Sequence, residues 1–336
     1  MKKILIAISL FYSLVSYAQK EDIKTVLSEI TEKVKSHYIN KETYKKVDSL
    51  LQSEYKKGTF NNLNKKDFST FITQKLRTDI KDKHFFFKYL DQYSPEKLVD
   101  EKQKEKENDF HNSLENFGFE NVLRMEGNIG YINLKGFASA KSSEKTLAAA
   151  MNFVANTNSL IIDLRENGGG DNEMLLLFCS YFFDKKTDLY TTYFRNKDKT
   201  VMNSTQPKVS GQKYLHKKVY ILTSEKSFSA SEGMAFFLRE HKVAEVIGET
   251  TGGGANPGEH FILQNKYFLF VPAGEVKSVI SHKNWEQVGV TPDLEVKPEN
   301  ALKAAHIRIL KDILKTGTRT ELSILEIKNL INKLEQ

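Results

Sequence analysis

The pattern of hydrophobic and polar residues changes near residue 128. Upstream, glycine is nearly absent and apolar residues recur at helical spacing, as in the set Ile23, Val26, Leu27 and Ile30. The run from Glu101 to Asn108 mixes both signs of charge, which fits a solvated helix face or a linker. This part of the chain is therefore predicted to be helical and polar.

Downstream, short apolar strands alternate with helical patterns. Strands are predicted at 129–134, 160–162, 219–222 and 243–247, and helices at 143–155, 173–183 and 230–240. A hairpin is predicted at 261–272, turning near Asn265, and two amphipathic helices follow Pro298. Strands that alternate with helices predict an α/β core with parallel strand pairing.

The first residues have the pattern of an export signal. Lys2 and Lys3 precede an uncharged apolar run that ends at Ser16-Tyr17-Ala18, where small residues suit a signal peptidase. The run is shorter than the roughly 20 residues of a membrane-spanning helix, and no later segment is long and apolar enough to span. A buried N-terminal helix is the alternative. We expect a periplasmic or secreted protein whose mature chain begins at Gln19, which N-terminal sequencing tests.

Composition narrows the function classes. The formal net charge of +7 is spread along the chain, without an Arg-rich stripe interleaved with aromatics, so nucleic-acid binding is not supported. The only cysteine, Cys179, can form no internal disulfide and is predicted to be a buried structural thiol. No cluster of His and Cys suggests a metal, and no cofactor is expected.

Length and pattern together suggest the domain organisation. The chain is longer than a usual domain of about 100–200 residues, so two units are expected. We predict a signal peptide at 1–18, an N-terminal helical domain at 19–120, an α/β domain at 121–300 and C-terminal helices at 301–336.

A glycine-rich turn follows the buried strand at 160–162. Its sequence is Arg165-Glu166-Asn167-Gly168-Gly169-Gly170. Glycines there let the backbone turn sharply and present bare N–H groups to a phosphate or a developing oxyanion. The G-x-G-x-x-G spacing of a dinucleotide site and the Gly-Lys-Ser/Thr of a P-loop are both absent. A plain tight turn is the alternative.

A serine-rich turn, residues 223–232, connects the next buried strand to a helix. Ser229 stands at the predicted helix N-terminus, where its hydroxyl is exposed and the following backbone N–H is free to stabilise negative charge. That arrangement suits a nucleophile. It equally suits a helix cap made by Ser229 or Ser231, and both interpretations stay open at this point.

A nucleophilic serine needs a base, and His84 is the best placed of the eight histidines. It lies where a polar stretch meets an aromatic strand, with Phe85 and Phe87 able to anchor it; His260 is the competing candidate. Glu286, beside the only tryptophan, is a candidate third member. An ordinary imidazole titrates near 6.5, so the acid limb of activity would lie at about pH 6–7.

Together these segments resemble the tail-specific (C-terminal processing) serine peptidase family. The closest branch is similar to the tricorn protease core and to the repeats of interphotoreceptor retinoid-binding protein. The resemblance runs from about residue 79 to 298. It is carried by Asp82-Lys83-His84, Gly130-Tyr131-Ile132, Asp163-Leu164-Arg165 with Asn167-Gly168-Gly169, Ser229-Ala230-Ser231-Glu232, the segment 248–254, and Asn284-Trp285-Glu286 with Gly289-Val290 and Pro292-Asp293.

The resemblance implies a ClpP/crotonase-like α/β fold and hydrolysis of polypeptides without metal or cofactor. In the lysine-dependent branch the base follows the nucleophile by 25 residues; here that position is Gly254, and no lysine lies between 242 and 266. The histidine-dependent branch implies a triad of Ser229, His84 and Glu286. It also implies an oxyanion hole made by the N–H groups of Gly169 and Ala230, with Gly168 as the alternative to Gly169.

Two departures accompany the resemblance. Gln287 follows Glu286 where the family usually has glycine, and no segment suits a peptide-binding PDZ module, so the substrate-binding residues are unknown. The alternative function is a non-catalytic ligand- or peptide-binding protein on the same fold. A pure binder has no need of the complete Ser229, His84 and Glu286 set. A CoA-thioester enzyme of the crotonase fold is disfavoured, because Ser-Ala-Ser-Glu has no role there.

Overall fold

A computed structural model describes residues 22–91 and 101–336, so the predicted signal peptide at 1–18 lies outside the described residues. By its internal contacts the chain divides into two compact units. The first comprises Met1–Leu98, Tyr193–Lys199 and Asn256–Glu275, and the second comprises the remainder. Both units are discontinuous in sequence, whereas the sequence pattern predicts domains that follow one another along the chain.

The first unit packs helices on a small antiparallel sheet. Its described helices are residues 22–37, α2 (Thr43–Lys56) and α3 (Lys65–Ile80). Its strands are β1 (Phe86–Tyr89), β9 (Gly258–Leu263) and β10 (Tyr267–Pro272), in the order β1-β10-β9. The N-terminal region is therefore mainly helical, as predicted, and it also contributes one strand.

Local signals explain two of these elements. The Asn64 side chain caps α3 by accepting from the N–H groups of Lys66 and Asp67, both at 2.9 Å. The predicted hairpin is confirmed as β9 and β10. Its turn contains Gln264 and Asn265, both at φ 49° in the left-handed region, which asparagine tolerates better than most residues.

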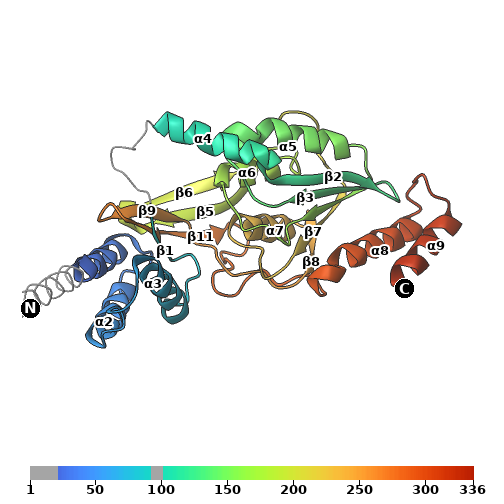
Figure 1. Ribbon diagram of the computed structural model, residues 1–336. Coiled ribbons are helices and arrows are strands. Elements are labelled where there is room, and N and C mark those ends of the chain that lie inside the picture. The colour runs from blue at the N-terminus through green and yellow to red at the C-terminus, as the bar shows by residue number, and fades with distance from the viewer. Residues whose placement is uncertain (1–21, 92–100) are drawn as a thin grey trace, which may run out of the picture. The chain divides into compact units, whose positions relative to one another are not determined.

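The second unit is built on a six-stranded sheet of order β12-β8-β7-β4-β3-β2 (Figure 1). All neighbours run parallel except β2, which pairs antiparallel with β3. The strands are β2 (Phe119–Met125), β3 (Ile129–Leu134), β4 (Ser159–Asp163), β7 (Lys218–Thr223), β8 (Ala244–Gly248) and β12 (Leu294–Glu295). The prediction of an α/β core with parallel pairing is confirmed.

A further three-stranded sheet has the order β11-β5-β6. Its strands are β5 (Asp188–Phe194), β6 (Lys199–Ser204) and β11 (Gly274–Ser278). The short helix η3 (Arg195–Lys197) connects β5 to β6. The residues of this sheet are divided between the two units.

Helices cover both faces of the six-stranded sheet, because side chains alternate along buried strands. Leu160 and Ile162 of β4 join the core under α5, α6 and α7, whereas Ile161 joins the core under α8 and α9. The helices are α5 (Ala140–Val154), α6 (Asn172–Ser180), α7 (Ala230–Glu240), α8 (Pro298–Thr316) and α9 (Ile324–Glu335). The two predicted C-terminal helices are confirmed.

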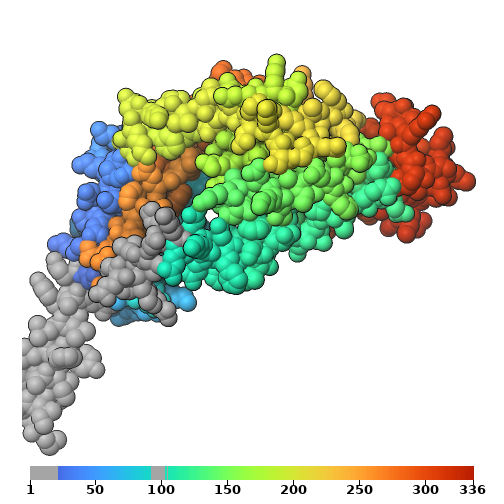
Figure 2. Space-filling model, turned by 90° about the horizontal axis from the view of Figure 1, so that it is seen from above, coloured from blue at the N-terminus to red at the C-terminus, as the bar shows by residue number. Residues whose placement is uncertain are grey.

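The charged run at 101–108 belongs to α4 (Glu101–Leu114), which the 3₁₀ turn η2 (Asn116–Gly118) follows. Figure 2 shows α4 and α5 side by side on the surface, in teal and green. Lys141 pairs with Glu105 at 2.7 Å and Ser142 donates to Asp109 at 2.5 Å across them. The run is thus the solvated face of a helix.

Burial confirms the prediction for the only cysteine. Cys179 in α6 is fully buried, and burial raises the pKa of its thiol, so it is a structural residue and not a nucleophile. Among the described residues, no helix combines the length and the apolar character that crossing a bilayer requires.

Candidate active site

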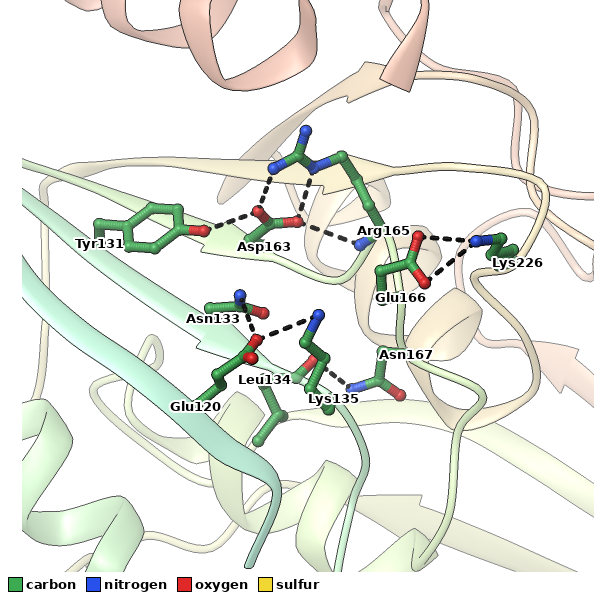
Figure 3. Close-up of polar contacts among 10 residues, drawn as sticks. All are labelled: Glu120, Tyr131, Asn133, Leu134, Lys135, Asp163, Arg165, Glu166, Asn167 and Lys226. Carbon is green, nitrogen blue, oxygen red and sulfur yellow. Dashed lines mark hydrogen bonds and ion pairs between the residues drawn. The ribbon is translucent and has the colours of Figure 1, made fainter. Parts of the chain in front are cut away.

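The glycine turn after β4 is fixed at its start by a buried carboxylate. Asp163 Oδ2 accepts from the Tyr131 hydroxyl at 2.8 Å and from Arg165 Nη2 at 2.5 Å, and Oδ1 accepts from Arg165 Nε at 2.9 Å and from the Arg165 backbone N–H at 3.2 Å (Figure 3). A bidentate pair with every lone pair used offsets the cost of burying the charge. The direction in which the chain leaves β4 is therefore set before the glycines begin.

Asn167 connects three segments around the turn. Its Nδ2 donates to the Leu134 carbonyl at the end of β3 at 2.9 Å (Figure 3), and its Oδ1 accepts from the Gly169 N–H at 2.8 Å. Its own carbonyl accepts from the Phe228 N–H at 3.0 Å and from the Ser231 hydroxyl at 2.9 Å. A fully buried asparagine thus joins β3, the glycine turn and the serine turn.

Three serines of the second turn are occupied in holding the two turns together. Ser224 Oγ donates to the Arg165 carbonyl at 2.5 Å, Ser227 Oγ to the Leu164 carbonyl at 2.7 Å, and Ser231 Oγ to Asn167. Within residues 22–91 and 101–336, Ser229 Oγ donates to no group, and the residue is only partly buried. Ser229 is therefore the serine of this turn whose proton is available.

The backbone at Ser229 has an unusual conformation. Ser229 occupies the N-cap position of α7 with φ 57° and ψ −118°, whereas an ordinary N-cap residue is extended at negative φ. A non-glycine residue at such angles is strained by about 1–3 kcal/mol, and this strain is typical of functional sites. A strained turn between a strand and a helix is also the geometry that exposes a nucleophilic serine.

The oxyanion donors proposed from the sequence lie beside Ser229. A Cβ added to Gly169 would come within 2.7 Å of the Phe228 carbonyl oxygen, 2.8 Å of Ser229 Cβ and 3.0 Å of the Ala230 nitrogen. Gly169 at φ 97° is thus required by both space and conformation. Its N–H donates to Asn167 Oδ1, so Gly168 remains the alternative donor, and a Cβ added to Gly168 would meet nothing within 4 Å.

Glu232, one turn into α7, binds the serine turn to a second glycine-rich loop. Its fully buried carboxylate accepts from the N–H groups of Ser229 (2.7 Å), Gly253 (2.6 Å) and Gly254 (2.9 Å) and from the Thr251 hydroxyl. Burial raises the pKa of Glu232, and these four donors oppose the rise. The sequence had signalled this residue only as part of Ser-Ala-Ser-Glu.

Glu286 is held against the same loop. Its Oε2 accepts from the Ala255 N–H at 2.7 Å, and its own N–H donates to Asn284 Oδ1 at 3.0 Å. The preceding Trp285 is buried, donates from Nε1 to the Gly254 carbonyl at 2.8 Å and packs on Phe236 and Phe237 of α7. The tryptophan therefore anchors the candidate acid to α7, the helix that Ser229 precedes as N-cap.

The Gln287 departure has a defined backbone consequence. Gln287 adopts φ 65°, the left-handed conformation that glycine takes without penalty, and its N–H donates to the Gly253 carbonyl at 2.9 Å. The backbone at Gln287 thus keeps the left-handed conformation that suits glycine, and for glutamine this conformation costs about 1–2 kcal/mol of conformational energy.

His84 lies in the first unit, between α3 and β1. Its N–H donates to buried Asp82 at 2.9 Å, and Tyr38 donates to the other Asp82 oxygen at 3.0 Å. The flanking Phe85 and Phe87 are buried, as the sequence predicted. In the sequence, Asp82 was recognised only as part of the motif Asp82-Lys83-His84. In the structure, its carboxylate fixes the backbone at His84 by accepting from the His84 N–H.

Burial, followed by the positive charge of Arg77, lowers the pKa of His84 to about 4. The expectation of an acid limb at pH 6–7 rested on an ordinary imidazole and is corrected by this shift. Because a lowered pKa keeps the ring neutral to lower pH, His84 can accept a proton at any pH well above 4.

His260, the competing histidine, is exposed on β9 and stacks on Phe268 with ring centroids 5.7 Å apart. His260 is therefore an exposed surface residue in this structure.

A family model described as Peptidase family S41 matches residues 128–296, half of the chain. The chain belongs to peptidase family S41. The match begins just before β3 and ends after β12, so it includes the glycine turn, the serine turn and the Trp285-Glu286 segment. Family S41 thus covers every candidate site residue of the second unit.

One curated relative and two solved structures show what else the chain is similar to. The chain is 30% identical over 128 residues to the carboxy-terminal processing protease CtpA of Bacillus subtilis, a match that covers 38% of the chain and 26% of CtpA. Among solved structures it resembles a putative peptidase from Parabacteroides merdae, with a TM-score of 0.55, 18% identity and coverage of 84% and 92%. It also resembles the tricorn protease, with a TM-score of 0.51, 14% identity and coverage of 94% and 37%.

The hydrogen bonds of Glu232 lead to a prediction for this S41 chain. Glu232→Gln keeps the volume but replaces one acceptor oxygen with an NH₂ group that faces N–H donors. We expect it to lower the free energy of unfolding by about 2–4 kcal/mol. It should also lower kcat by more than tenfold in the protein that remains folded, because the Ser229 backbone loses its acceptor. Urea unfolding and steady-state kinetics measure the two effects.

Glu240→Gln is the matched control, at the other end of the same helix. Among the residues that the structure describes, Glu240 accepts from one side chain, the Ser278 hydroxyl. This variant should cost less than about 1 kcal/mol and leave kcat unchanged. Equal losses of kcat in the two variants would show that Glu232 has no special relation to Ser229.

Proposed function

We propose that this chain is a serine-type peptidase that hydrolyses peptide bonds in exported polypeptides, with Ser229 as its nucleophile. One observation carries the proposal. Ser229 alone of the four turn serines combines a strained backbone, a proton not donated to a described group, and a place beside the Ala230 N–H. A structural cap needs none of these features.

The chemistry would be acyl transfer. Ser229 Oγ attacks the carbonyl carbon while its proton passes to His84, and the carbonyl oxygen becomes an oxyanion held by the N–H groups of Ala230 and of Gly169 or Gly168. Collapse expels the amine, which takes the proton from His84. Water then attacks the acyl-enzyme in the same way, which restores Ser229.

His84 is proposed as the base for two reasons. The position of the lysine in the lysine-dependent branch is Gly254, which is buried and uses its backbone for Glu232 and Trp285. His84 also occupies the place of the base in the histidine-dependent branch that the chain resembles. Glu286 is proposed to orient or electrostatically support His84.

The proposals on export and on the substrate rest on two segments of the chain, the segment matched by the curated relatives and residues 1–18. The matched segment spans about a quarter to a third of the curated relatives, so their processing activity is carried over only as part of this proposal. The pattern at residues 1–18 supports an exported, periplasmic or secreted protein, and with it polypeptide substrates in that compartment.

Labelling with a fluorophosphonate tests the proposal. This probe reacts with an activated serine hydroxyl and not with an ordinary helix cap. We expect stoichiometric labelling at Ser229, found by peptide mass mapping, and its loss in Ser229→Ala. An unlabelled protein that binds peptides would instead favour the non-catalytic binding protein on the same fold.

A further inference from the structure

The first unit contains a large groove whose lining includes none of the proposed catalytic residues Ser229, His84 and Glu286. It is lined mainly by residues of α3 and β1, has a volume of about 1590 Å³, and is lined only by residues of the first unit. We call it the α3–β1 groove; its walls include Lys66, Thr73, Arg77, Phe86, Lys88 and Tyr89. Sites for small ligands typically measure about 300–1,000 Å³, so this groove has room for a chain segment.

The wall formed by α3 is a continuous helix face. Lys66, Thr70, Thr73 and Arg77 follow one another at intervals of four, three and four residues. Lys65 and Arg77 are twelve residues apart in the helix, which corresponds to about 18 Å at 1.5 Å per residue. An extended peptide of about five residues, at roughly 3.3 Å each, matches this length.

The groove carries excess positive charge. Its acidic residues are Asp22 and Asp91, and Asp22 already pairs with Lys266 at 3.3 Å. Lys65, Lys66, Arg77 and Lys88 remain, and none forms an ion pair with a side chain in the described part of the protein. An occupant with carboxylates would supply the missing partners.

The two ends of the groove pair a cation with an aromatic ring. The Arg77 guanidinium lies 5.7 Å from the centre of the Phe86 ring, and Lys65 Nζ lies 5.4 Å from the centre of the Tyr89 ring. Phe86 is 37% exposed, which is unusual for a strand phenylalanine. These surfaces suit an occupant that alternates acidic and apolar side chains.

The middle of the backbone edge of β1 is not free to pair with a peptide, so a peptide in the groove would be recognised through side chains. Thr73 Oγ1 accepts from the Phe87 N–H at 2.8 Å and donates to the Phe87 carbonyl at 2.6 Å. The outward backbone groups in the middle of β1 are therefore occupied, and a peptide cannot extend the sheet there. A recessed groove also does not match the flat surface of a membrane.

We propose that the α3–β1 groove binds an extended acidic segment of polypeptide, which would tether a substrate at a place separate from the catalytic serine. The choice of a polypeptide rests on the proposed peptidase function. The charge, length and aromatic ends rest on the groove itself. Such a site would bind the substrate in place of a PDZ module, for which the sequence has no suitable segment.

The test measures binding without chemistry. Ser229→Ala protein is titrated into a fluorescein-labelled hexapeptide of alternating Glu and Phe, and fluorescence anisotropy is recorded. Lys66→Glu combined with Lys88→Glu, both exposed, should weaken binding by about tenfold. Lys41→Glu combined with Lys56→Glu changes the net charge equally outside the groove and should leave the affinity unchanged. Added salt should weaken the binding.

Three results would overturn the proposal. They are equal binding by the groove variant and its control, equal binding of a hexapeptide with Lys in place of Glu, and displacement of the peptide by a short oligothymidylate at similar concentration. The last would identify a nucleic-acid groove. Because every measurement uses Ser229→Ala protein, a failure here is distinct from a failure of fluorophosphonate labelling at Ser229.

Discussion

Ser229→Ala should lower the rate of peptide hydrolysis by about 10⁴- to 10⁶-fold while leaving the fold intact. The hydroxyl contributes little to packing, because it is partly exposed and donates to no group within residues 22–91 and 101–336. The backbone strain at φ 57° remains in the alanine variant. Hydrolysis of an unstructured reporter protein, followed by gel and mass spectrometry, measures the effect.

Two companion variants separate chemistry from structure. Ser229→Gly also lacks the hydroxyl but relieves the strain, so it should be inactive and about 1 kcal/mol more stable than Ser229→Ala. Ser231→Ala removes the hydrogen bond to Asn167 and should cost about 1–2 kcal/mol of stability while much activity remains. An inactive Ser231→Ala beside an active Ser229→Ala would place the nucleophile two residues further on.

His84→Ala should lower kcat by about 10⁴-fold or more, because without a base the Ser229 hydroxyl stays protonated as it attacks. Glu286→Gln should produce a smaller loss, since an orienting acid usually matters less than the base it supports. His260→Ala is the control and should retain most activity, because its ring is exposed on β9. A fully active His84→Ala protein would remove His84 from the mechanism.

The pH profile adds a readout that a structural role for His84 would not produce. With the pKa of His84 lowered to about 4, kcat/KM should stay near its maximum down to about pH 5 and fall as pH drops through about 4. Arg77→Gln removes the second cause of the shift, so the limb should move to higher pH. A limb that stays in place would assign it to another group.

The sequence predicted the elements of the second unit well, because their signals are local. Buried strands such as 160–162 and the helix 230–240 follow from runs of apolar residues and helical periodicity, and both were found. Glycines, serines and the Trp285-Glu286 pair could likewise be recognised as unusual residues at the ends of such elements. These observations, with the resemblance, were enough to place the chain in its family.

Only the tertiary structure decided what each polar residue does. Ser224, Ser227, Ser229 and Ser231 are chemically alike in the sequence, and they differ because three of them meet carbonyls of a turn about 60 residues away. Glu232 and Asn167 bind partners that no local pattern identifies, and the pKa of His84 depends on burial, which is a property of the folded chain. Sequence periodicity reports which face of an element is buried, whereas hydrogen-bond partners and desolvation depend on how distant segments meet.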